Sequence, residues 1–142
     1  MNRHGIRHGL GRDDGAAAVE FALIAPLLFM LIFGIIQFGI AWSQKEIFVQ
    51  AAREGARFAA VACEKSACDS GDVQDRVEEA AVGYAISGGS GAVTVTPDPG
   101  CDVADTSDTV TVRWDQQFTF NIPFVPPINT TAPIEAVFRC ER

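Results

Sequence analysis

A long uncharged segment near the N-terminus limits what this chain can fold into. No residue in 21–44 carries a charge, and Gln37 is the only strongly polar side chain before Trp42. A bilayer core about 30 Å thick requires roughly 20 residues of helix, whereas a buried helix in a small domain is usually shorter and apolar on one face. The sequence therefore predicts a membrane-spanning helix over residues 16–44.

The residues that precede this segment predict its orientation. Arg3, Arg7 and Arg12 lie before the span, and positive charge keeps a flanking segment on the cytoplasmic side. A removable secretory signal has an apolar region of only about 7 to 15 residues and ends at a small-residue cleavage site. Since this segment is longer and runs on to Trp42 and Lys45, we expect it to be retained, with residues 45–142 exported as a head domain.

The charge and the motifs of the chain exclude several classes of function. The formal net charge is −7 with no basic stripe, so nucleic acid is not an expected partner. Both histidines, His4 and His8, precede the span, and the exported part has no Gly-rich phosphate loop or nucleophile elbow. We expect neither an enzyme nor a cofactor. Asp102, Asp105 and Asp108 are interpreted as a solvated loop, with a calcium site as the alternative.

The four cysteines all follow the span: Cys63, Cys68, Cys101 and Cys140. The first two have a Cys-x4-Cys spacing, but the other two are far apart and no histidine accompanies them, so we expect no zinc or other metal site. Two disulfides in an exported domain are the better interpretation. Four cysteines allow three pairings, which the sequence leaves open; a short loop favours Cys63 with Cys68, and Cys101 would then pair with Cys140.

Helical patterns predict two helices. The periodicity of the span continues beyond Trp42, so one helix is expected from about residue 17 to residue 62. Small side chains in its last third either pack in the core of the head or make contacts between subunits. A second helix is expected over residues 72–86, capped by Asp69 or Ser70 and ended by the glycines at 88–89.

Alternating apolar side chains after the second helix predict three or four antiparallel strands. The alternation occurs around residues 93–96, 110–114, 118–122 and 134–140, and a proline-rich loop is expected over residues 123–133. In that loop Phe124, Val125 and Ile128 either contact a partner or pack back over the edge of the sheet. Helices packed on one antiparallel sheet give an α+β fold.

The boundary between the N-terminal residues and the span contains a specific motif. Residues 15–21 read GAAAVEF, with Gly15 followed by small or apolar residues, Glu20 and an aromatic residue. A carboxylate at the centre of a bilayer costs about 2.5–3.5 kcal/mol, so Glu20 requires a partner unless it lies among the headgroups. The arrangement resembles the prepilin-type leader of type IV filament proteins, in which an aspartic peptidase cuts after the glycine.

This resemblance implies roles for three residues. Cleavage after Gly15 would remove the leader, residues 1–15, and make Ala16 the new N-terminus. Glu20 would then pair with an N-terminal amine in the assembled filament, which offsets the cost of its desolvation. The continuation of the span into AAREGAR at residues 51–57 also resembles the TadE-like family of tight-adherence pilus systems.

The family resemblance implies a pilin-like fold and a role as a minor pseudopilin, an assembly or structural subunit of a tight-adherence (Flp) pilus or a related type IV filament or secretion system. The protein would reside in the inner membrane or in the extracellular pilus. Its expected partners are membrane lipid, the prepilin peptidase, other pseudopilins with the major pilin, and the inner-membrane assembly platform. The alternative is an uncleaved single-pass envelope protein with a binding head.

Overall fold

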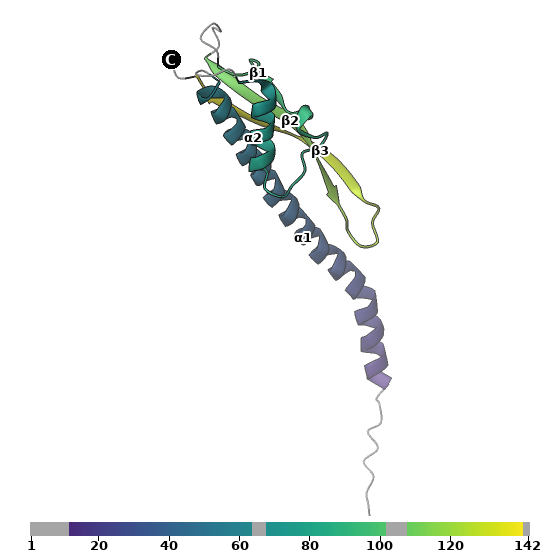
Figure 1. The fold of residues 1–142 in the computed structure, drawn as a ribbon. Coiled ribbons are helices and arrows are strands. Elements are labelled where there is room, and N and C mark those ends of the chain that lie inside the picture. Colours follow the sequence, from purple (N-terminus) through teal and green to yellow (C-terminus); the bar gives the residue numbers. More distant parts are fainter. Residues whose placement is uncertain (1–11, 64–67, 102–107, 141–142) are drawn as a thin grey trace, which may run out of the picture.

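A 50-residue helix, α1 (Arg12–Val61), is the axis of the structure. The computed structural model describes residues 12–63, 68–101 and 108–140. The remaining elements are α2 (Ser70–Ala80), the 3-10 turn η1 (Ser90–Ala92), β1 (Thr94–Thr96), β2 (Thr109–Phe120) and β3 (Ile128–Arg139). In Figure 1, α2 and the strands lie against the C-terminal half of α1, and the N-terminal half projects alone. This arrangement confirms the predicted α+β, pilin-like fold.

Helix α1 is close to its predicted extent. It begins at Arg12, five residues before the predicted start, because a single glycine at position 15 weakens a helix by only about 1 kcal/mol and does not end it. It also continues through Pro26 and curves gently over its N-terminal half (Figure 1). The large apolar side chains between Val19 and Trp42 are exposed on every side of the helix, so this half has no buried face.

Helix α2 is shorter than predicted. At its N-terminus Asp69 and Asp72 form a capping box, in which the Asp72 N–H donates to Asp69 Oδ1 at 3.1 Å and the Asp69 N–H donates to Asp72 Oδ2 at 3.0 Å. The prediction that the helix reaches residue 86 is wrong. After the C-cap residue Ala81, Val82 and Gly83 both have a positive φ, of 30° and 81°, and residues in such conformations end a helix.

The strands form an antiparallel sheet in the order β1-β2-β3, within the predicted range of three to four strands. The strand segments predicted around residues 110–114 and 118–122 form one continuous strand, β2. They are continuous because Gln116 occupies the inward position between Trp114 and Phe118. The predicted loop over residues 123–133 is also too long, since β3 already begins at Ile128. Pro133 lies in β3, opposite Asp115, and β3 is an edge strand where a missing N–H is tolerated.

The core is built on a strip of small side chains along the C-terminal half of α1. The strip consists of Ala51, Ala52, Gly55, Ala56, Ala59 and Ala60, all of them buried. A Cβ atom placed on Gly55 would overlap the side chain of Val77 in α2 and lie 3.8 Å from Val112 in β2. The strip therefore packs within the head, the first of its two predicted alternatives, and is not exposed for contacts between subunits.

Two further contacts join the layers of the head. The ring of Phe48 on α1 lies 6.1–6.3 Å from the rings of Tyr84, Trp114 and Phe118, each in an edge-on arrangement. The amide of buried Gln116 accepts hydrogen bonds from Trp114 Nε1 and from the Ser87 N–H, both at 3.1 Å. Because a buried amide must be hydrogen-bonded, Gln116 fixes the segment after α2 to the sheet.

We predict that Gly55→Ala destabilises the head. Alanine favours a helix over glycine by about 1 kcal/mol, but overpacking against Val77 costs about 1–3 kcal/mol, so a net loss of about 1 kcal/mol is expected. Unfolding of the detergent-solubilised chain, followed by the fluorescence of buried Trp114, measures the change. Gly39→Ala is the matched control, because an added Cβ there meets no atom within 4 Å.

In the Val77→Ala background the same Gly55→Ala substitution should cost less, because the overlapping methyl group of Val77 is gone. An effect of Gly55→Ala no larger than that of Gly39→Ala would contradict the packing described here.

Candidate functional site on the long helix

The predicted processing residues lie in an exposed part of α1. Gly15, Ala16 and Glu20 are exposed, and a Cβ on Gly15 would meet no atom within 4 Å. Ala16 and Glu20 are four residues apart in one helix and therefore lie on the same face. Glu20 makes no ion pair with any side chain that the structure describes. The geometry brings the two residues together, and their roles in processing and pairing stay predictions.

The exposed half of α1 has the properties of a membrane span. Within Gly15–Val61 a window of 18 residues has a mean hydropathy of 2.5 and no buried residue, so this helix is long and apolar enough to cross a bilayer. Where the charge-free segment ends, Lys45 Nζ lies 5.8 Å from the centre of the Trp42 ring. Tryptophan and lysine are typical of the interface between a membrane and water.

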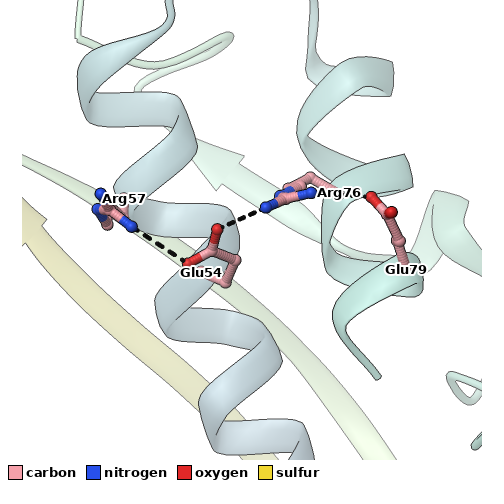
Figure 2. A network of polar contacts seen from close by, with 4 residues as sticks. All are labelled: Glu54, Arg57, Arg76 and Glu79. Carbon is pink, nitrogen blue, oxygen red and sulfur yellow. Dashed lines mark hydrogen bonds and ion pairs between the residues drawn. The ribbon is translucent and has the colours of Figure 1, made fainter. Parts of the chain in front are cut away.

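The AAREGAR motif at residues 51–57 has a structural role on both of its faces. Its small residues belong to the buried strip, and Glu54 points toward α2 (Figure 2). Arg76 Nη2 on α2 contacts Glu54 Oε1 at 2.8 Å, and Arg76 Nη1 contacts Glu79 Oε2 at 2.9 Å. Arg57 lies farther from Glu54, at 3.7 Å. The motif thus attaches α2 to α1 by packing and by charge.

These contacts change the pKa values of both partners. The hydrogen bond from Arg76 lowers the pKa of Glu54, and the charges of Arg76 and Arg57 act in the same direction. The hydrogen bonds to Glu54 and then to Glu79 raise the pKa of Arg76. All of these side chains are at least one-third exposed, so solvent screening keeps the energy of each pair small.

Two disulfides close the part of the head farthest from the span. Cys63 pairs with Cys68 between α1 and α2, and Cys101 pairs with Cys140 between the segment after β1 and the end of β3. These are the pairings that the sequence analysis favours, and the disulfide interpretation of the four cysteines is confirmed. On the chain-entropy estimate the longer loop stabilises the fold by about 3–4 kcal/mol.

The acidic segment interpreted as a solvated loop falls largely outside the described residues, which include Asp108 but not Asp102 or Asp105. Among the residues described, no group of three or more His, Cys, Asp or Glu side chains is placed to hold a metal ion.

Two of the three apolar residues of the proline-rich turn, Phe124 and Ile128, do not pack back over the sheet edge as one alternative predicts. Phe124 is 90% exposed and Ile128 49%, whereas Val125 is partly buried. Arg76 was not predicted from the sequence, because its partner Glu54 lies far away in the chain. The spacing of three residues between Arg76 and Glu79 indicates an ion pair within α2, but it does not indicate the second ion pair, with Glu54 on α1.

Taken together, the fold defines an α+β, pilin-like protein with one exposed apolar helix suited to a membrane. Residues 15–57 match the family model described as TadE-like protein. This part of the chain is therefore similar to the TadE-like family, which suggests a protein associated with a tight-adherence pilus. No curated protein and no solved structure matches the chain. The matched segment begins at Gly15 and includes the span and the whole AAREGAR motif.

We predict that the contribution of Glu54 to stability disappears at low pH. Its pKa is lowered in the folded state, so the stabilisation is present above the pKa of the unfolded chain and is lost as the pH falls through the folded value. The difference in unfolding midpoint between the wild type and Glu54→Gln should be largest at pH 7 and should shrink between about pH 5 and pH 3.

Glu79→Gln is the control for this comparison. Its side chain is 73% exposed and its partner Arg76 is on its own helix, so it should have a smaller effect at every pH. A Glu54→Gln effect that does not change with pH would show that the ion pair with Arg76 does not stabilise the fold.

Proposed function

We propose that this protein is a minor pseudopilin, a structural subunit rather than an enzyme, of a tight-adherence pilus or a related type IV filament or secretion system. In this proposal the N-terminal half of α1 anchors the chain in the inner membrane, and the head lies on the exported side. The prepilin peptidase, the other pilins and the inner-membrane assembly platform are its partners.

The observation that carries this proposal is the extent of the TadE-like match. It covers residues 15–57, which are the exposed half of α1 and the first part of the strip that holds the head. A pilin-type subunit needs both parts, because its helix must leave the lipid and pack against other helices while its head stays folded. The two parts are joined here in one uninterrupted helix.

The packing of the head restricts where such a subunit can meet its neighbours. The small-residue strip is already buried against α2 and the sheet, so it is closed to a second chain. The large apolar side chains from Val19 to Trp42 are exposed, and only those near the end of this segment, Phe38 and Trp42, lie close to the head in the described part of the chain. Helix contacts between subunits would therefore form along the N-terminal half of α1, in place of lipid.

We predict that the leader is removed after Gly15. N-terminal sequencing of the membrane-extracted protein from cells with an active prepilin peptidase should begin at Ala16, and deletion of that peptidase should leave the full-length chain. Gly15→Val should block cleavage, because the cut follows a glycine in leaders of this type, whereas Gly34→Ala should leave it unchanged. Finding only the full-length chain in peptidase-positive cells would favour the uncleaved envelope protein.

We predict that Glu20→Ala abolishes or strongly reduces pili without affecting cleavage or the head. After cleavage the amine of Ala16 would lie one helical turn from Glu20, so the carboxylate pairs with an amine of its own or a neighbouring subunit. Such a pair offsets the cost of a charge near lipid. The measurement is the yield of surface pili in a strain that lacks the native copy, with protein level and processing recorded.

Glu46→Ala is the matched control for this experiment, because Glu46 is an exposed acid on the same helix outside the charge-free segment. Normal pili with Glu20→Ala, at normal protein level and processing, would rule out the pairing mechanism.

A further inference from the structure

The β2–β3 hairpin runs back along α1 toward the membrane span. At one end the Cys140 N–H donates to the Asp108 carbonyl at 2.9 Å, in the part of the head that the Cys101–Cys140 disulfide closes. At the other end a shallow groove separates the hairpin from α1, and its walls include Phe38 and Trp42 on α1 and Phe118, Phe120, Thr130 and Ala132 on the hairpin. The hairpin therefore reaches the level at which the charge-free segment of α1 ends.

The turn of the hairpin extends beyond this level. Phe120 and Ile128 form the last pair of the ladder, and residues 121–127 connect them. Figure 1 shows the turn pointing toward the N-terminal half of α1. A seven-residue turn can extend beyond the last pair by about three residues of extended chain, which is at most about 10 Å. The same length corresponds to about seven residues of helix. The turn can thus lie beside the apolar residues just before Phe38.

The composition of this hairpin end is unusual for an acidic, exported domain. No residue in 116–134 carries a charge, although charged residues make up 20% of the chain. Phe124 is 90% exposed at the tip, Ile128 is 49% exposed, and prolines surround both. Exposed apolar side chains that are grouped in this way mark a surface that binds a partner or a membrane.

The backbone of the turn has few free hydrogen-bond donors. Pro123, Pro126 and Pro127 have no N–H, and the Val125 N–H donates to the Ile122 carbonyl at 3.1 Å. An unpaired backbone N–H is costly where water is scarce, and this cost excludes lipid-exposed loops from the hydrocarbon core of a bilayer. Three prolines and one internal hydrogen bond remove much of that cost. The turn is therefore better suited to the boundary of the hydrocarbon core than a loop in which every N–H is unpaired.

We propose that the tip of the β2–β3 hairpin, residues 121–128, inserts Phe124 and Ile128 into the headgroup region of the outer leaflet of the bilayer that α1 spans. The inference rests on the proposed membrane anchoring of α1. Lipid is the occupant that the geometry favours, because the tip lies at the depth of a helix surface that is itself exposed and apolar. The head would then touch the membrane at two points, α1 and the tip, which restricts its tilt.

Tryptophan fluorescence of the full-length chain in vesicles tests this proposal. The vesicles contain phosphatidylethanolamine and phosphatidylglycerol, with or without bromine atoms on the acyl chains near the headgroups. The emission added by Phe124→Trp, measured as the difference from the wild type, should be blue-shifted and should be lost in brominated vesicles. Ile128→Trp is a second variant with the same expected result.

Val137→Trp is the matched control, because Val137 is 56% exposed on β3 but lies opposite Thr111, far along the hairpin from the tip. Its added emission should be that of a water-exposed tryptophan and should not be quenched. The native Trp42 reports on α1 independently: if the wild-type chain floats with the vesicles and its emission is quenched, the helix is inserted.

The outcomes separate the two proposals. Unquenched, water-like emission from Phe124→Trp and Ile128→Trp in a chain whose Trp42 is quenched would overturn the tip insertion and leave the anchoring intact. Failure of the wild type to float with the vesicles would overturn the anchoring itself. A blue shift that grows with protein density, without quenching by brominated lipid, would show contact with a second copy of the chain and would also overturn the lipid assignment.

Discussion

The close approach of α2 and the sheet to α1 through small side chains is the constraint on which the rest of the structure depends. Gly55 leaves no room for a Cβ beside Val77, and Ala59 accepts a hydrogen bond through its carbonyl from the Cys101 N–H at 3.3 Å. At such short range the head cannot rotate about the helix without losing its core. Because the same helix continues into the apolar half, the orientation of the span fixes that of the head.

The two halves of α1 therefore differ in whether their apolar side chains are buried within the chain. The C-terminal half is packed within the chain, where the Glu54–Arg76 ion pair and the Phe48 ring cluster add to the contacts of the strip. The N-terminal half buries nothing within the described chain, and its exposed apolar side chains require lipid or other helices. A helix with this exposed apolar surface is suited to a membrane, and the same surface can pack against other helices in place of lipid.

Much of this fold could be predicted from the sequence, because the strongest signals are local. The charge-free segment, the periodicity of α1 and the alternation of apolar residues in β2 each depend on neighbours in the chain. The end of α2 was missed, since Gly83 is one of several glycines and the sequence does not show which of them adopts a positive φ. The start of β3 was missed for a different reason: whether Pro133 is tolerated in a strand depends on which strand lies at the edge, and that is a property of the whole sheet. Gln116 and Arg76 were missed because their partners, Ser87 and Glu54, are distant in the sequence.

The central claim is that the span and the head share one rigid helix, and a distance across their boundary tests it most directly. Spin labels on non-natural residues at positions 35 and 53 of the full-length chain in vesicles would leave the four cysteines in their disulfides. Eighteen residues of continuous helix separate these positions, so the two Cα atoms should be about 27 Å apart. The account predicts a single narrow distribution centred near that distance, whereas a broad distribution or a clearly shorter distance would show that the helix bends or breaks between membrane and head.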